Sequence, residues 1–225
     1  MVYLIYYYGK ISLKEDFMDY KHVYEDNGTV VVESVKRFEL ADIFDNGQCF
    51  RWNPVSDDTY RGIAHGKQID VSRKGNNLYL TNATVDDFNL IWKDYFDFSR
   101  SYDDIINAFS GDETLAKATK FAPGLLVLRQ DPWEALASFI LSQNNNIKRI
   151  KGLVERFAEN FGEAIPGGFA FPKPEVIAAL TVDDLSPVRA GFRSKYLIDA
   201  AQKVASGEVS LTEPYTMDID QAREH

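Results

Sequence analysis

The chain has 225 residues, of which 45% are hydrophobic and 26% charged, and its formal net charge is −9. This length and hydrophobic content permit two subdomains with separate cores. No stretch approaches the roughly 20 apolar residues that a membrane helix requires. The single cysteine, Cys49, excludes an internal disulfide and a thiolate-rich metal cage, and His22, His65 and His225 show no ligand spacing. We therefore expect no metal and no other cofactor.

The N-terminal sequence predicts no export. Residues 1–8 contain no basic leader and no small-residue cleavage site, and their apolar run is too short for a signal peptide. We expect a monomeric cytoplasmic protein that does not contact a membrane, and that is nucleoid-associated in a bacterium.

The acidic balance argues against a nucleic-acid partner, because Lys and Arg normally supply much of the affinity for phosphates. The charge is not uniform, however. Residues 147–156 contain four cations and one anion, a local excess of three positive charges within ten residues. Any nucleic-acid contact is expected at this segment.

The first half of the chain predicts strands and turns. Residues 26–28, Asp-Asn-Gly, separate a strand at 21–24 from the β-branched run at 29–32, which is typical of a hairpin whose turn needs positive φ. Further strands are expected at 48–53, 59–64, 68–72 and 78–81. Two helices, at 85–96 after Thr84 and at 102–109 after Ser101, are expected to cover one face of the antiparallel sheet.

The second half changes to helical periodicity. Asp131 suits an N-cap, Pro132 suits the first helical position, and apolar residues recur at helical spacing through residue 141. A second helix is expected at 147–161, closed by Gly162. The Pro- and Gly-rich segment 165–174 predicts a loop. Further helices are expected at 175–180, at 182–185, at 193–205 before Gly207, and from Met217 onward.

Three consecutive asparagines, residues 144–146, separate the two strongest predicted helices. One can close the first helix in a left-handed conformation and another can cap the second, which accounts for two of the three. Lys148, Arg149 and Lys151 follow in the first turn, where the helix dipole disfavours cations by roughly 0.3–1 kcal/mol. Cations, amides and free backbone N–H groups together are typical of a phosphate seat beside an extruded base. A solvated helix face is the alternative.

Two other clusters can likewise be interpreted either as binding sites or as ordinary structural elements. At residues 47–52, GQCFRW, a turn enters a strand, and Gly47 would let a flat ligand approach its carbonyl. On residue types alone, an ordinary strand start with Phe50 and Trp52 as core residues is the favoured explanation. At residues 190–196, AGFRSKY, Arg193 and Lys195 stand at a helix start. Because cations recur at two helix starts, an anion-binding face is favoured.

In combination and in this order, four segments closely resemble the 8-oxoguanine DNA glycosylases: GQCFRW (47–52), LRQDPWE (128–134), SQNNNIKRI (142–150) and GFRSKY (191–196). The resemblance implies an α+β fold. An N-terminal antiparallel β-sheet domain, like half of the TATA-binding-protein fold, would occupy residues 1–120. An α-helical, truncated helix-hairpin-helix glycosylase domain would follow at 121–225. The implied partner is double-stranded DNA containing 8-oxoguanine.

The resemblance also implies residue roles. Gly47 would present its carbonyl to the N7 hydrogen that distinguishes 8-oxoguanine from guanine. Asn144 would enter the space vacated by the flipped base, and Arg149 and Arg193 would contact the estranged cytosine. Phe192, where the family often has tyrosine, would wedge into the base stack. The candidates for phosphate contact are Asn146, Lys148, Lys151 and Lys195.

No catalytic residue is predicted in this chain. Members of the family continue after the GFRSKY-like segment with a glycine-rich hairpin, of the type LPGVGxKVAD, that holds a nucleophilic lysine, and then with a catalytic aspartate. No GxGxK follows Tyr196, and the only later lysine, Lys203, lies in a helical pattern without such a hairpin. We expect the natural fold to continue beyond His225. The chain would then be an inactive portion of a base-excision DNA glycosylase and AP lyase that recognises 8-oxoguanine opposite cytosine by base flipping.

Two other functions remain open. One is a non-catalytic DNA-binding module. The other is a glycosylase for alkylated bases, which shares the helix-hairpin-helix architecture, although the GQCFRW and NNN segments argue against it.

Overall fold

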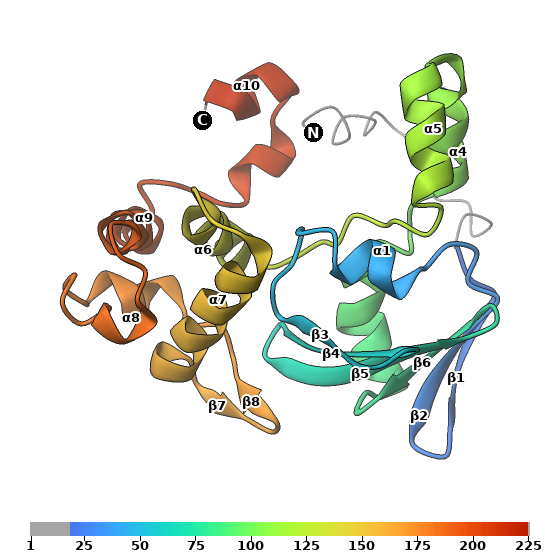
Figure 1. Cartoon of the computed structure of the whole chain (residues 1–225), viewed down its shortest axis with the longest axis horizontal. Helices are drawn as coiled ribbons and strands as arrows, with labels where there is room; N and C mark the ends of the chain where they lie inside the picture. The colour runs from blue at the N-terminus through green and yellow to red at the C-terminus, as the bar shows by residue number, and fades with distance from the viewer. Residues whose placement is uncertain (1–18, 225) are drawn as a thin grey trace.

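The computed structural model describes residues 19–224, which form two halves that lie side by side (Figure 1). A six-stranded antiparallel sheet dominates the first half, and helices form the second. The predicted α+β fold is therefore confirmed. Residues 1–8, used above to predict localisation, lie outside the described residues, as does His225.

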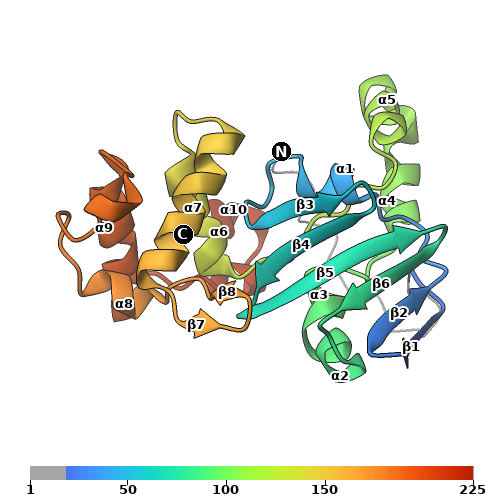
Figure 2. The same cartoon turned by 60° about the horizontal axis from the view of Figure 1, so that its bottom comes forward.

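The sheet has the strand order β1-β2-β6-β5-β4-β3, and all neighbouring strands are antiparallel (Figure 2). Its strands are β1 (His22–Asp26), β2 (Thr29–Glu33), β3 (Trp52–Ser56), β4 (Thr59–Ala64), β5 (Lys67–Lys74) and β6 (Asn77–Thr81). The hairpin predicted at residues 26–28 is present. Asn27 has φ +49° and Gly28 φ +75°, as a tight hairpin turn with the right-handed strand twist requires.

The strand predicted at 48–53 is displaced toward the C-terminus. Strand β3 begins at Trp52 and continues through Pro54 to Ser56. A proline is tolerated there because β3 is an edge strand that pairs only with β4. Residues 48–50 stay outside the sheet because Gln48 is hydrogen-bonded to the connector between the two halves, residues 122–131.

Short helices surround the sheet. The helix predicted at 85–96 is present as α2 (Val85–Asp87), a π-helical turn (Phe88–Trp92) and α3 (Lys93–Tyr95), and Thr84 caps it. The helix predicted at 102–109 is α4 (Tyr102–Ala108), which a 3-10 turn (Phe109–Gly111) follows. Two helices were not predicted: α1 (Leu40–Phe44), which is one turn long, and α5 (Glu113–Phe121), which buries no residue.

The second half contains the two predicted long helices, α6 (Pro132–Ser142) and α7 (Ile147–Phe161). The Asp131 carboxylate accepts a hydrogen bond from Glu134 N at 2.9 Å, which confirms the predicted N-cap. The segment predicted as a loop contains a small hairpin. The remaining elements are β7 (Ala164–Ile165), β8 (Gly168–Phe169), α8 (Pro174–Ala178), a 3-10 turn (Ser186–Val188), α9 (Arg193–Ser206), a 3-10 turn (Glu213–Thr216) and α10 (Ile219–Glu224).

The helix predicted at 182–185 is wrong. Leu185 N donates to Val182 O and Ser186 N donates to Asp183 O, so the segment closes bonds between residues three apart rather than four. Such a tight turn is what a segment this short forms when no longer helix propagates it. By contrast, the predicted end before Gly207 is confirmed: α9 ends at Ser206, and Gly207 follows in the left-handed conformation.

Each half has its own hydrophobic core. The first is rich in aromatic side chains and includes Trp52, Trp92 and Phe96, all nearly inaccessible. Leu126 and Leu128, from the connector, also pack in this first core. The second core lies among α6, α7, α8 and α9. The boundary predicted after residue 120 stays a prediction. In the described part of the chain no helix is both long and apolar enough to cross a membrane.

Candidate nucleic-acid interface

The asparagine triplet forms the turn between α6 and α7, and its members do different things. Asn144 adopts the left-handed conformation with φ +49°. The Asn145 amide donates to Leu141 O at 3.2 Å and so closes the end of α6. The Asn146 side chain accepts from Arg149 N at 3.0 Å and caps α7. The exposed side-chain amide of Asn144 has no hydrogen-bond partner among residues 19–224, so it is available to a ligand.

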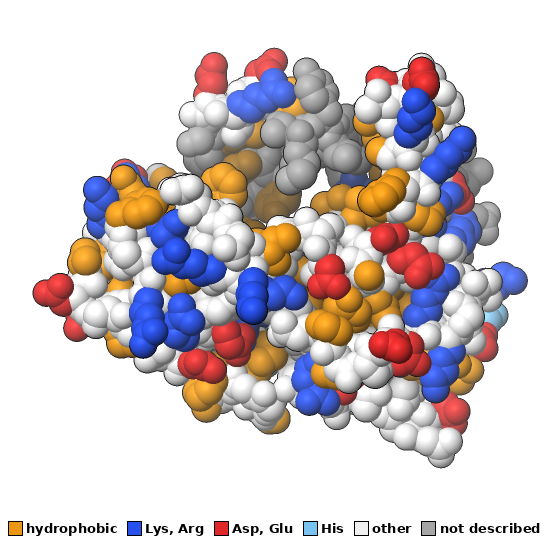
Figure 3. Space-filling model, viewed as in Figure 1, with side chains coloured by type: hydrophobic (Ala, Val, Ile, Leu, Met, Phe, Trp, Pro, Cys, Tyr) orange, Lys and Arg blue, Asp and Glu red, His pale blue; other side chains and the backbone are white. Residues whose placement is uncertain are grey.

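The start of α7 is positively charged and accessible. Lys148 and Arg149 are exposed, and neither side chain forms an ion pair or hydrogen bond with any residue from 19 to 224. The first turn contains no acidic residue. The backbone N–H groups at this helix end add to the positive potential. On the face shown in Figure 3, Lys and Arg side chains gather over the region of α7 and α9.

Lys151, unlike Lys148 and Arg149, is bound within the protein. Its ammonium donates to Trp52 O at 2.7 Å and lies 3.7 Å from a carboxylate oxygen of Asp45. Only 20% of its side chain is exposed. The predicted phosphate contact of Lys151 stays a prediction, and within the described chain its charge is engaged at the junction of the two halves.

The start of α9 lies against the triplet turn. Arg193 is only 4% exposed, and its guanidinium donates to the carbonyls of Gln143 (2.9 Å), Asn144 (3.1 Å) and Ala190 (3.2 Å). The bonds to Gln143 and Asn144 satisfy carbonyls that follow the end of α6 and have no helical partners. Arg193 thus holds the backbone of Asn144 in place. Its predicted contact with cytosine stays a prediction.

Phe192 presents an exposed aromatic ring next to this support. The ring is 53% exposed, covers the Arg193 guanidinium at 4.5 Å from its centroid, and meets Tyr196 edge-on. Lys195 is exposed, and its ammonium lies 4.8 Å from the centre of the Tyr196 ring. Arg189, which the sequence analysis did not select, is exposed three residues earlier with φ +62°. Aromatic and cationic groups are therefore concentrated at this end of α9.

Gly47 lies in a turn that faces α7. Its φ of +85° is in the region that favours glycine. A Cβ atom placed on Gly47 would lie 3.4 Å from Ile147 Cδ1, so the turn lies in contact with the first residue of α7. The structure therefore brings Gly47 beside the triplet turn, although almost a hundred residues separate them in sequence.

Gln48 holds this turn in place, although its local sequence gives no sign of that role. Its amide nitrogen donates to Ile43 O and to Leu126 O, both at 2.9 Å, and its amide oxygen accepts from Leu128 N at 3.0 Å. The Gln130 side chain donates back to Gln48 O at 2.6 Å. The LRQ residues before Asp131 were visible as part of a family motif, but their pairing with Gln48 depends on the tertiary fold.

Glu134 is a second residue that the sequence analysis did not select. Burial raises the pKa of its carboxyl to about 7; Asp131 and Glu155 also raise it, and the Arg51 guanidinium opposes the increase. Burial also raises the pKa of the Cys49 thiol to about 12. Cys49 is therefore a protonated, buried side chain that is poorly suited to nucleophilic chemistry.

Lys203 has the environment of a surface lysine. It lies on α9, and its ammonium donates to Asp199 at 3.0 Å. This hydrogen bond raises the pKa of Lys203, which favours the protonated amine and disfavours nucleophilic attack. Among residues 19–224, no three His, Cys, Asp or Glu side chains come together in a way that could hold a metal ion.

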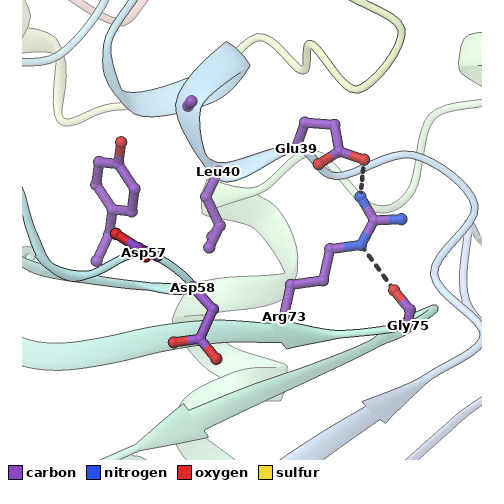
Figure 4. A pocket seen from close by; sticks show the side chains of 8 residues that line it. Glu39, Leu40, Asp57, Asp58, Arg73 and Gly75 are labelled. Carbon is purple, nitrogen blue, oxygen red and sulfur yellow. Dashed lines mark hydrogen bonds and ion pairs between the residues drawn. The ribbon is translucent and has the colours of Figure 1, made fainter.

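A cavity of about 460 Å³ lies in the sheet half, beside α1 (Figure 4). Arg73, Glu39, Asp57 and Asp58 line it. Arg73 donates to Phe38 O and Gly75 O and pairs with Glu39, so its charge is engaged. The remaining carboxylates make this cavity unsuitable for a phosphate.

Two family models match the chain. The model described as the N-terminal domain of 8-oxoguanine DNA glycosylase matches residues 30–136, and that of the HhH-GPD superfamily of base excision DNA repair proteins matches residues 137–223. A solved structure of the Clostridium acetobutylicum 8-oxoguanine glycosylase/lyase, in complex with dsDNA containing cytosine opposite to 8-oxoG, is 36% identical, with a TM-score of 0.87. The alignment covers 92% of this chain and 73% of that one.

The chain belongs to the 8-oxoguanine DNA glycosylase family. A structure of MBOgg1 with a low affinity DNA ligand is 41% identical, with a TM-score of 0.86 and the same coverage of 92% and 73%. Among curated relatives, the N-glycosylase/DNA lyase of Saccharomyces cerevisiae is 37% identical over 43% of this chain and 28% of its own length. The DNA-3-methyladenine glycosylase of Bacillus subtilis is 29% identical over 59% and 46%. The matched part of this chain spans less than half the length of these curated relatives.

Proposed function

We propose that this chain carries the lesion- and strand-reading part of an 8-oxoguanine DNA glycosylase and AP lyase, which acts on 8-oxoguanine opposite cytosine in double-stranded DNA. The observation that carries the proposal is the contact between Gly47 and Ile147, because it joins the predicted lesion-reading turn to the predicted strand-reading turn. The DNA named for the Clostridium acetobutylicum relative supports this substrate.

Recognition would act on an extruded base. The Gly47 carbonyl would accept a hydrogen bond from N7–H of 8-oxoguanine, which guanine lacks, and a base can reach it only after leaving the stack. The free Asn144 amide would occupy the vacated space. Arg149 would hydrogen-bond the estranged cytosine from the exposed side of α7, and the Phe192 ring would wedge beside it. Arg193 would read the same cytosine while holding the Asn144 backbone.

Phosphate contacts would come from the accessible groups around these residues. Lys148 and Lys195 are exposed cations, and Asn146 stands at the start of α7. The net charge of −9 is compatible with this role because the cations are concentrated locally. We propose that the protein acts as a monomer on DNA in the cytoplasm or nucleoid, without a membrane partner.

In a complete enzyme of this type, a lysine amine attacks C1′ of the extruded nucleotide. The glycosidic bond breaks, the oxidised base leaves, and the resulting Schiff base permits β-elimination of the 3′ phosphate. A carboxylate stabilises the positive charge that develops on the sugar. We propose that this 225-residue chain performs recognition without these steps, because its only lysine after Tyr196 is the Asp199-paired Lys203.

The proposal is tested by measuring both binding and trapping. We expect tighter binding to a duplex with 8-oxoguanine opposite cytosine than to the undamaged duplex, and an affinity that falls between about 50 and about 200 mM salt. Borohydride is expected to trap no covalent adduct. Equal affinity for the two duplexes would contradict lesion recognition, and an adduct would contradict the inactivity of this chain.

Two alternatives predict other outcomes. A non-catalytic DNA-binding module, which the exposed cations Lys148 and Arg149 favour, would bind damaged and undamaged duplexes equally in a salt-sensitive manner. A glycosylase for alkylated bases, favoured by the similarity to the Bacillus subtilis protein, would prefer a duplex containing 3-methyladenine. Direct competition between the two damaged duplexes separates these possibilities.

A further inference from the structure

Two cations cross the junction between the halves in opposite directions. Lys151 extends from α7 to the start of β3, and Arg51 extends from the residue before β3 to the helical half. Arg51 lies near Gly47 in sequence, and Lys151 lies near the Gly47 turn in space. Lys151 and Arg51 form their contacts within the protein, whereas other nearby cations, such as Lys148 and Arg149, are exposed.

Lys151 binds both ends of the segment that contains Gly47. Its ammonium donates to Trp52 O at 2.7 Å, at the C-terminal end, and lies 3.7 Å from Asp45, at the N-terminal end. The Asp45 carboxylate also accepts a hydrogen bond from Tyr60 on β4. The segment 45–52 is therefore closed by a single ammonium group supplied by the helical half.

The placement of Lys151 on α7 is specific. Lys151 follows Ile147 by four residues, so both side chains lie on one face of the helix. Ile147 contacts Gly47 while Lys151 binds Trp52 O, which gives the turn two points of attachment to α7. A phosphate contact would compete with these bonds for the same ammonium group.

Arg51 makes the reciprocal attachment. It is 4% exposed, its Nη2 donates to Phe169 O on β8 at 2.6 Å, and its Nε lies 3.7 Å from Glu155 on α7. The small hairpin that carries Phe169 is itself pressed against the sheet, since a Cβ atom on Gly168 would lie 2.7 Å from Ile63. The same segment is thus attached to α7 and to β8.

We propose that Lys151 is a positioning residue for lesion discrimination: it fixes the Gly47 turn at one distance from the start of α7, so that one extruded base and its estranged partner are read together. The role rests on the proposed function above. It also assigns Lys151 a different task from Lys148 and Arg149, which share its helix and its charge.

The test compares Lys151→Met with Lys120→Met in the 225-residue chain. Both substitutions remove one positive charge, and Lys120 is an exposed residue of α5. Hydrogen exchange is measured over residues 45–52, and affinity is measured for duplexes with 8-oxoguanine or guanine opposite cytosine. We expect faster exchange in Lys151→Met and a preference for the lesion reduced about tenfold, the factor that one charge-assisted hydrogen bond supports. Lys120→Met should change neither, and Lys151→Arg should restore most of the preference.

Other outcomes decide against the role. If Lys151→Met weakened both duplexes by the same factor, lowered the salt slope by about 0.9 and left exchange unchanged, Lys151 would be a phosphate contact. Unchanged exchange with unchanged preference would also overturn the positioning role. If the unmodified chain showed no lesion preference, the proposed function would fail, and the exchange measurement alone would then decide whether Lys151 holds the turn.

Discussion

The two segments that meet at the site offer different parts of the chain to a ligand. In segment 45–52 the polar side chains are engaged within the protein: Asn46 and Gln48 bind backbone groups and Arg51 is buried, which leaves the backbone at the half-buried Gly47 for a ligand. In segment 143–149 the carbonyls of Gln143 and Asn144 are engaged by Arg193, and side chains such as Arg149 are exposed. We propose that the first segment reads a ligand with its backbone at Gly47 and the second with exposed side chains such as Arg149.

The largest expected effect comes from removing the support of the second segment. Arg193→Ala leaves the carbonyls of Gln143 and Asn144 without their charged donor, and we expect the free energy of unfolding to fall by about 3 kcal/mol. Urea denaturation of both variants provides the measurement, with Arg149→Ala as the control. Similar losses in the two variants would remove the distinction between the buried and the exposed arginine.

A second test concerns the carboxyl of Glu134, which interacts with Arg51 of segment 45–52. The pKa of Glu134, about 7, lies above its ordinary value of 4.5, so the folded state binds this proton more tightly than the unfolded state does. The stability from this proton is fully present below about pH 4.5 and is lost as the pH rises to about 7. Glu134→Gln should remove that loss, gaining about 1–2 kcal/mol relative to the unmodified chain between about pH 5 and pH 8.

The control for this pH profile is Glu159→Gln, an exposed glutamate on α7. Its unfolding profile should follow that of the unmodified chain throughout the range. A Glu134→Gln profile parallel to the unmodified one would show that Glu134 ionises at its ordinary pKa in the folded protein.

A smaller effect is expected at the turn itself. Gly47→Ala places a Cβ in the left-handed region and against Ile147, and we expect a loss of about 1 kcal/mol in the free energy of unfolding together with weaker lesion preference. Gly28→Ala is the matched control, because Gly28 has φ +75° but open space around its Cβ position. A Gly28→Ala variant with the same loss of lesion preference would contradict the backbone-reading role of Gly47.

The smallest stability effect is expected at Arg149. Its exposed guanidinium supports no other described group, so Arg149→Ala should change the free energy of unfolding by less than about 0.5 kcal/mol. Affinity should nevertheless fall at least about tenfold for 8-oxoguanine opposite cytosine, and less for 8-oxoguanine opposite adenine, because the lost contact reads the opposing base. An equal fall for both duplexes would indicate a phosphate contact instead.

Local sequence rules predicted much of the fold. The hairpin at residues 26–28, the Asp131 cap and the end of α9 at Gly207 each depend on interactions between near neighbours. The same local rules failed where an element depends on its tertiary environment. The strand start moved to Trp52 because Gln48 binds residues 126 and 128, and α5 was missed because its helix buries no side chain.

The sequence by itself therefore determined the fold class, the family resemblance and the residues that form the two turns, since these follow from periodicity, capping and ordered motifs. Only the tertiary structure decided which cations are exposed and which are engaged. The sequence does not show which way a cationic side chain at a helix start points. It therefore cannot distinguish among Lys148, Arg149, Lys151 and Arg193. The packing of the two halves turns Lys151 toward Trp52 O, and the packing of α9 against the turn between α6 and α7 turns Arg193 toward Gln143 O. Burial requires such partners, whereas Lys148 and Arg149 are left in solvent.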